Sequence, residues 1–272
     1  MDNHQPETSG LQRDEVCPTH GAYVSTNFYR DKWSSCGACA KALSEQQEAD
    51  AREAERRVRQ KIRTIRSGLR GRFLDATFAT YTAGTPNQAA VLAACRSYAE
   101  DFGDGTSGLW LLGKPGTGKT HLGSAIVNFV IATHDAQAMI FSGREIIRLL
   151  RSTWGDKAQP MIGAVETASG GYVEIRYPET EAGMIDMLGE VPLLVIDEIG
   201  VSFGSDAETV QLFDVIDRRY SLRLPTVILS NLTAPELKGV LGDRAYDRLR
   251  EGARLLNCKW PSARGASDTD RA

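Results

Sequence analysis

The chain has 272 residues, of which 42% are hydrophobic and 25% are charged, and its net charge is −3. These values are typical of a globular protein with one large core and a smaller module. The slight negative charge excludes a general attraction to nucleic acid, so any such contact must be local. No apolar stretch approaches the roughly 20 residues of a membrane helix, and the polar N-terminus lacks a signal sequence. We therefore expect a soluble, cytoplasmic protein with no membrane partner.

The N-terminal part is expected to hold a disordered tail over residues 1–14 and a metal-binding module over residues 15–40. The module contains four candidate ligands in the order C-x2-H, a gap of 15 residues, and C-x2-C: Cys17, His20, Cys36 and Cys39. Three thiolates and one imidazole suit Zn²⁺, and a closed set of four ligands favours a structural site. Because so small a module lacks a sufficient apolar core, the metal would supply its folding free energy. The alternative is that these cysteines cluster by coincidence.

The loop between the two ligand pairs mixes aromatic and basic residues. These residues either stack on nucleic-acid bases or form the small core of the module. They are Tyr23, Phe28, Tyr29, Arg30, Lys32 and Trp33.

Residues 41–71 are predicted to form a long amphipathic basic helix and linker. Residues 40–67 contain no Gly or Pro and are rich in helix-forming residues. Small or apolar residues recur at steps of three and four, which produces a narrow stripe: Ala51, Ala54, Val58, Ile62, Ile65 and Leu69. Residues 56–72 are basic and contain no acid. We favour a partner helix on the stripe and nucleic acid or an acidic partner on the basic face, over packing on the following domain.

Residues 72–264 alternate strand-like and helix-like segments, and residues 265–272 read as a disordered tail. The predicted strands are 109–112, 138–142, 193–197, 226–230 and 254–258. This alternation predicts an α/β fold in which a five-stranded parallel sheet is flanked by helices on both faces. Residues 157–178 interrupt the alternation and form either a hairpin or a disordered loop.

The sequence from 113 to 120 matches the phosphate-binding loop G-x-x-x-x-G-K-[ST] between an apolar strand and a helix. Its glycines let backbone N–H groups approach phosphate oxygens, and the helix N-terminus favours the same anion. Lys119 would reach the β- and γ-phosphates, and the Thr120 hydroxyl would hold Mg²⁺. The candidate nucleotide contacts are Gly113, Lys114, Pro115, Gly116, Thr117, Gly118, Lys119, Thr120 and His121.

Two later strands end in polar residues that complete this site. The apolar strand 193–197 ends in Asp197, and Glu198 comes directly after it. Asp197 would join the ligands of Mg²⁺, and Glu198 would act as general base. Asn231 follows strand 226–230 and would orient the attacking water. Arg244 and Arg248 share one face of a helix, and either are ordinary surface arginines or reach the nucleotide of a neighbouring subunit.

These motifs resemble the AAA+ ATPases, and more closely the DnaC-type replicative helicase loaders, over residues 67–264. The similarity includes Ser67-Gly-Leu-Arg70, the phosphate-binding loop, Leu193 to Val201, Asp217-Arg-Arg219 and Leu241 to Leu249. It implies that Asn231 is the sensor-1 residue, Arg248 the arginine finger with Arg244 as companion, and Arg264 the sensor-2 arginine.

The resemblance also implies the partners of a bacterial or phage-encoded loader. Such proteins assemble side by side, up to six on the ring, bind single-stranded DNA, and place a hexameric replicative helicase on it. Their N-terminal module contacts the helicase. Arg151 and Trp154, with Ser205 as a weaker companion, are candidate DNA contacts, although an aromatic at a helix end also serves as a core plug.

Two other functions remain open at this point. One is an IstB-like helper ATPase of a transposition system, which shares the nucleotide motifs and differs in its partner. The other is a zinc-dependent DNA-binding regulator in which ATP is only a structural ligand. The Asp197-Glu198 pair favours hydrolysis over this last alternative.

Overall fold

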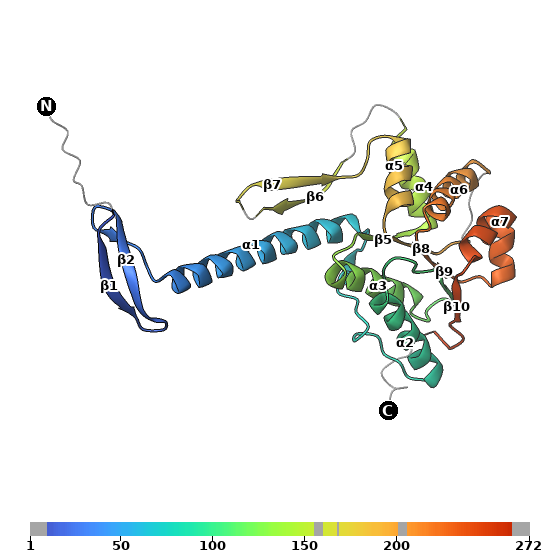
Figure 1. The fold of residues 1–272 in the computed structure, drawn as a ribbon. Helices are drawn as coiled ribbons and strands as arrows, with labels where there is room; N and C mark the ends of the chain where they lie inside the picture. Colours follow the sequence, from blue (N-terminus) through green and yellow to red (C-terminus); the bar gives the residue numbers. More distant parts are fainter. Residues whose placement is uncertain (1–9, 155–159, 168, 201–205, 263–272) are drawn as a thin grey trace. The chain divides into compact units, whose positions relative to one another are not determined.

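A computed structural model describes residues 10–154, 160–167, 169–200 and 206–262 (Figure 1). The chain divides into two compact units, residues 1–57 and residues 58–272. Each unit is treated separately below. Within the described residues, no helix is both long enough and apolar enough to cross a membrane.

The first unit is a small antiparallel sheet followed by the start of a helix. Its strands are β1 (Gln12–Cys17), β2 (Gly21–Tyr29) and β3 (Lys32–Trp33), and α1 (Gly37–Arg66) follows. β1 begins inside the segment expected to be a disordered tail, because polar side chains on a short edge strand carry no apolar alternation. Phe28 and Tyr29 are exposed, so they do not form the core of the module.

The second unit is built on a five-stranded parallel sheet with strand order β10-β4-β9-β8-β5. All five strands were predicted, and only the last ends one residue early. They are β4 (Leu109–Leu112), β5 (Ala138–Ser142), β8 (Leu193–Asp197), β9 (Thr226–Ser230) and β10 (Arg254–Asn257). Every residue of β4, β8 and β9 is buried, which explains why these strands are almost wholly apolar.

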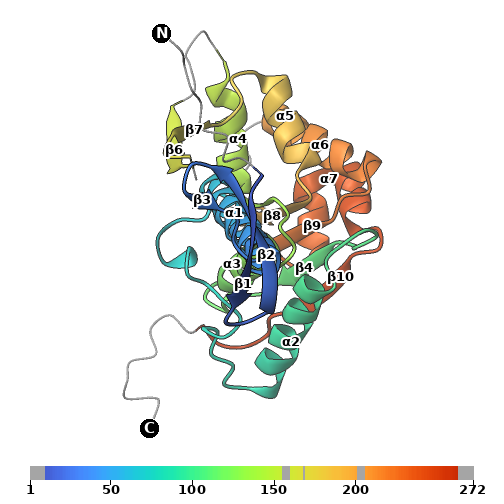
Figure 2. The ribbon, with the colours of Figure 1, turned by 60° about the vertical axis from the view of Figure 1, so that its left-hand side comes forward.

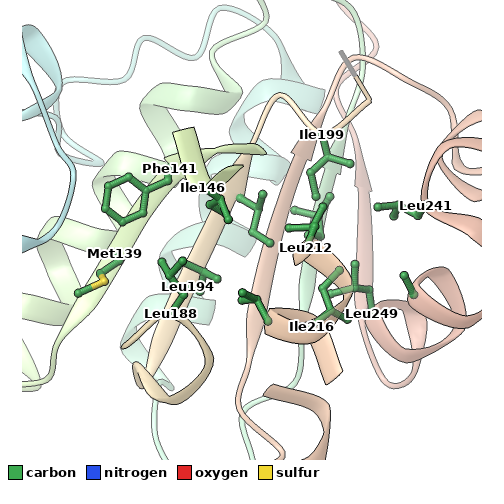
Figure 3. Close-up of a cluster of buried hydrophobic side chains, with 14 of the residues drawn as sticks. Met139, Phe141, Ile146, Leu188, Leu194, Ile199, Leu212, Ile216, Leu241 and Leu249 are labelled. Carbon is green, nitrogen blue, oxygen red and sulfur yellow. The ribbon is translucent and has the colours of Figure 1, made fainter. Parts of the chain in front are cut away.

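Helices cover both faces of this sheet, as Figure 2 shows. α2 (Pro86–Glu100) and α3 (Lys119–Thr133) pack on one face, and the short 3₁₀ helix Gly71–Phe73 contacts α3. The other face is covered by α4 (Gly143–Ser152), α5 (Glu181–Glu190), α6 (Asp206–Ser221) and α7 (Ala234–Arg250). Figure 3 shows the buried side chains that these last helices contribute.

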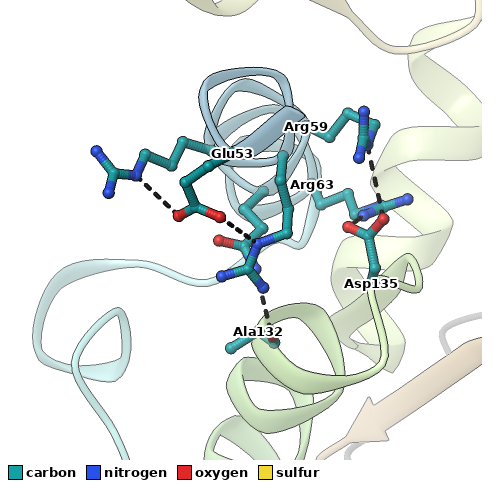
Figure 4. Close-up of polar contacts among 8 residues, drawn as sticks. Glu53, Arg59, Arg63, Ala132 and Asp135 are labelled. Carbon is teal, nitrogen blue, oxygen red and sulfur yellow. Dashed lines mark hydrogen bonds and ion pairs between the residues drawn. The ribbon is translucent and has the colours of Figure 1, made fainter. Parts of the chain in front are cut away.

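The C-terminal turns of α1 pack on the second unit, of which they are part. Gln60 donates to the carbonyl of Ala132 at 3.0 Å, and Arg59 and Arg63 form ion pairs with Asp135 (Figure 4). The helix ends at Arg66, close to the end of the Gly- and Pro-free segment 40–67, and the rest of the predicted helix and linker follows it. Gly68 then takes φ +80 and lies so close to the backbone of Ile140 and the ring of Phe141 that a side chain would not fit.

The segment within residues 157–178 is a hairpin where it is described, which settles the choice between hairpin and loop. β6 (Met161–Glu166) and β7 (Tyr172–Arg176) pair antiparallel. A Cβ at Gly163 would lie 2.8 Å from Cγ2 of Ile65, so the hairpin covers part of the apolar stripe of α1. This contact covers the stripe at Ile65 with a segment of the same chain.

Candidate functional site

The phosphate-binding loop joins β4 to α3 at the carboxyl edge of the sheet. Gly118 takes φ +86 as the residue before α3, a conformation that favours glycine. The Lys119 ammonium lies inside the loop, where it donates to the carbonyls of Gly113 at 2.6 Å and Lys114 at 2.9 Å. The carbonyls of the loop thus hold the ammonium in place.

A pocket of about 580 Å³ opens at this loop and gathers most of the predicted nucleotide residues. Its lining includes Pro115, Gly116, Thr117, Gly118, Lys119, Thr120, His121, Asp197, Glu198 and Asn231. Gly113 and Lys114 contribute their carbonyls to Lys119 instead. The His121 ring contacts the segment between α1 and α2, where Nε2 lies 2.9 Å from the carbonyl of Thr77.

The two acids at the end of β8 have different environments. Asp197 is buried, accepts a hydrogen bond from the Thr120 hydroxyl at 2.7 Å, and accepts another from the Glu198 N–H at 2.8 Å. Burial raises the pKa of Asp197, and the Thr120 hydroxyl opposes this shift. Glu198 is exposed and has φ +51, a strained backbone conformation of the kind found at functional sites.

One buried hydroxyl, which sequence reasoning missed, ties the polar strand ends together. Ser230, the last residue of β9, donates to the carbonyl of Ile199 at 2.7 Å and accepts from the N–H of Leu232 at 3.1 Å. It therefore links the turn that carries Glu198 to the turn that carries Asn231. A serine at the end of an apolar strand gives no sequence signal that separates it from an ordinary strand terminus.

The pocket also has a wall that the sequence did not predict. It comes from the segment between α1 and α2, from the first turn of α2 and from the chain after β10. These residues are Arg72, Phe73, Asp75, Ala76, Thr80, Tyr81, Thr82, Gln88 and Trp260. Asn128 on α3 anchors part of this wall by donating to the carbonyls of Phe73 and Ala76.

Among the described residues, the predicted arginines lie away from this pocket of their own subunit. Arg248 is partly buried, forms an ion pair with Asp217, and lies 4.8 Å from the Phe213 ring centroid. Arg244 is exposed and lies 5.2 Å from the same ring. Arg264 falls outside the described residues.

The candidate DNA contacts Arg151 and Trp154 lie at the end of α4. The Trp154 side chain is 58% exposed, so it is not a core plug. Its indole N–H donates to Glu181 at 3.3 Å, and the Arg151 guanidinium lies 5.9 Å from its ring. The third candidate, Ser205, falls outside the described residues.

The four metal-ligand candidates converge at one end of the small sheet. Cys17 and His20 flank the turn between β1 and β2, and Cys36 and Cys39 stand at the start of α1. All four donor atoms lie within 4.8 Å of one another, and Nδ1 of His20 is 3.3 Å from Sγ of Cys39. Ligands of a tetrahedral Zn²⁺ lie about 3.5 to 3.8 Å apart, so the cluster fits this ion.

Two thiols of this cluster have pKa values shifted in opposite directions. Hydrogen bonds from the backbone N–H groups of Thr19 and His20 lower the pKa of Cys17 to about 6. The neighbouring Cys17 sulfur raises the pKa of Cys39 to about 11. At neutral pH the Cys17–Cys39 pair therefore shares a proton that metal binding must displace.

Comparison with known proteins places the chain in a family. DnaC, the replicative helicase loader of Buchnera aphidicola subsp. Schizaphis graminum, is 33% identical over 200 residues, which are 73% of each chain. The loader DnaC of Escherichia coli K12 is 32% identical over 216 residues, 79% of this chain and 80% of that protein. No protein-family model matches the chain.

The comparison with solved structures agrees with this family. A crystal structure of the DnaC helicase loader superposes with a TM-score of 0.56 at 21% identity, over 69% of this chain and 99% of that one. The second unit therefore has the AAA+ ATPase fold. The named relatives favour the loader over the transposition helper and the DNA-binding regulator.

Proposed function

The chain belongs to the family of DnaC-type replicative helicase loaders, and from this premise we propose that it loads a hexameric replicative helicase onto single-stranded DNA in an ATP-dependent cycle. Binding and hydrolysis of ATP with Mg²⁺ would switch the protein between loading and releasing the helicase. The first unit, with its bound Zn²⁺, would contact the helicase.

The hydrogen bond between Thr120 and Asp197 carries the nucleotide part of this proposal. It brings the hydroxyl of the phosphate-binding loop and the acid of β8 to 2.7 Å, although they are far apart in sequence. These two oxygens are the ligands that P-loop proteins offer to Mg²⁺. The ion would supply positive charge to the phosphate oxygens.

The chain's own residues have separable tasks in hydrolysis. The Lys119 ammonium would move from the loop carbonyls to the β- and γ-phosphates. Glu198 lines the pocket with an exposed carboxylate and would accept the proton of the attacking water. Asn231, which lines the same pocket, would orient that water.

The position of Arg248 supports a site completed between subunits. Within its own subunit, Arg248 is paired with Asp217 and does not line the described part of the pocket. To act as an arginine finger it would leave Asp217 and reach the γ-phosphate bound by a neighbour, with Arg244 beside it. Side-by-side assembly of up to six subunits would supply that neighbour.

Arg151 and Trp154 support contact with single-stranded DNA. An exposed indole can stack on any base, and a nearby guanidinium can pair with phosphate. Such binding would be independent of DNA sequence.

The role of Glu198 is tested by Glu198→Gln. We expect ATP hydrolysis to fall by about 100-fold or more, because the amide cannot accept the proton, while ATP affinity stays nearly unchanged. Phosphate release and nucleotide titration measure the two quantities. Glu179→Gln, an exposed carboxylate outside the pocket, is the matched control and should retain activity. Full turnover by Glu198→Gln would contradict the assignment.

The role of Arg248 between subunits is tested by mixing two inactive variants. Arg248→Ala keeps its own phosphate-binding loop, and Lys119→Ala keeps its own Arg248. If the finger acts on the neighbour, the mixture regains part of the ATPase activity that neither variant shows alone. Lys119→Ala mixed with Arg248→Ala/Lys119→Ala is the control and should stay inactive. Absence of any recovery would point to a role within one subunit.

The metal assignment is tested on the full-length protein by its zinc content. Cys36→Ala and Cys39→Ala should each lose bound Zn²⁺, whereas Cys95→Ala, a buried residue of α2, should keep it.

Zinc binding should also depend on pH. Because the pKa of Cys39 is raised, zinc binding at pH 7.5 should release protons, and zinc affinity should fall as pH falls. Titration calorimetry in buffers of different ionisation enthalpy measures this release. Unchanged zinc content in both ligand variants would refute the site.

A further inference from the structure

Two aromatic side chains from distant segments donate hydrogen bonds to one carbonyl of the phosphate-binding loop. The Tyr81 hydroxyl donates to the Thr117 carbonyl at 3.2 Å, and the Trp260 indole N–H donates to the same oxygen at 3.1 Å. Thr117 and Trp260 are buried, so the bond from the indole is shielded from water, whereas the bond from the half-buried Tyr81 is partly shielded. Burial raises the pKa of Tyr81 to about 12, so its hydroxyl remains a donor at neutral pH.

The chain after β10 lies along the outside of the same loop. Cys258 donates its N–H to the carbonyl of Leu112 at 2.7 Å and would collide with any side chain at Gly113. Ser262 lies against Gly116 in the same way. The ring of Tyr81 covers Gly118, where a Cβ would come within 2.6 Å of Cε2. The loop is therefore held from outside along its length.

The shared carbonyl determines which way the next amide points. In a trans peptide group the C=O and the N–H lie in one plane and point in opposite directions. Two donors that hold the Thr117 carbonyl therefore turn the Gly118 N–H away from the aromatic side chains. Gly118 has φ +86. Because glycine adopts many backbone conformations, Gly118 by itself does not prevent this peptide group from rotating.

We propose that Tyr81 and Trp260 are positioning residues that hold the Thr117–Gly118 peptide group with its N–H directed at the phosphates of the bound nucleotide. The inference rests on the proposed nucleotide site. It adds two residues that do not belong to the phosphate-binding motif, and it makes phosphate affinity depend on the segments before α2 and after β10. Loss of one donor leaves the carbonyl with the other, whereas loss of both frees the peptide group to rotate.

The test uses Tyr81→Phe and Trp260→Phe, which remove the donors and retain aromatic rings, alone and together in the full-length chain. Each single variant should bind ADP about threefold more weakly, and the double variant about 30-fold more weakly, as expected for one and then both hydrogen bonds to a single group. In turnover, KM for ATP should rise by a similar factor while kcat changes less than about twofold.

Two matched controls separate positioning from general stability. Trp110→Phe also removes an indole N–H from a buried carbonyl, that of Leu249 at 3.2 Å, but its side chain packs on the face of the sheet opposite to that of Tyr81 and Trp260. Tyr98→Phe removes a buried hydroxyl that has no partner among the described residues. Both should keep the ADP affinity of the unchanged protein, and Trp110→Phe should melt at a lower temperature.

The outcomes distinguish this inference from the proposed function. If the double variant binds ADP within about twofold of the unchanged protein and only melts lower, as Trp110→Phe does, the two side chains are merely structural. If the double variant fails to fold, the two single variants decide by the same ADP titration. If the unchanged protein binds neither ADP nor ATP, the proposed nucleotide site fails, and this inference fails with it.

Discussion

The candidate site depends on one hydrogen bond, between the hydroxyl of Thr120 and the carboxylate of Asp197. Thr120 follows β4 and Asp197 ends β8, and β9 lies between these strands in the sheet. The bond forms only if all three strands run parallel and end at the same edge. Their burial on both faces fixes that arrangement, because any slip in register would expose apolar side chains. The chemistry of the pocket is thus a consequence of how the sheet is packed.

The position of β9 explains why Asn231 and Glu198 belong to the same site. Ser230 closes β9 and bonds to the carbonyl of Ile199 beyond β8, so the two turns move as one structure. A second buried polar group stabilises the opposite edge of the sheet. Arg219 donates to the carbonyls of Leu188, Val191 and Pro225 and to the hydroxyl of Thr226. Burial lowers the pKa of Arg219 to about 9, which shows how strongly this position disfavours an unpaired charge.

The sheet and the loop were predictable because their signals are local. A strand buried on both faces is apolar throughout, and the loop must place glycine where φ is positive, so both features are visible in a few consecutive residues. The cysteine pairs and the acids after β8 are local in the same sense. The metal cluster and the nucleotide residues of the pocket are accordingly brought together as expected.

What the sequence could not reveal depends on contacts between distant segments. Tyr81 and Trp260 meet at Thr117 although they are far apart in the chain, and neither lies in a periodic pattern. Arg219 stands in a motif shared with the family, yet its role is structural, which only its burial shows. The stripe on α1 predicted a partner helix because periodicity identifies an apolar face and not what covers it. At Ile65 the cover is the β6–β7 hairpin.

The central claim is that nucleotide controls the hold of this protein on a replicative helicase. The most direct measurement is co-purification of the full-length chain with a hexameric replicative helicase from the same source, once in ATP and once in ADP. The control is Lys119→Ala, which lacks the ammonium that would bind the nucleotide phosphates. The account predicts a complex whose amount differs clearly between ATP and ADP, and no such difference for Lys119→Ala. Equal complex in both nucleotides, or no complex in either, would contradict it.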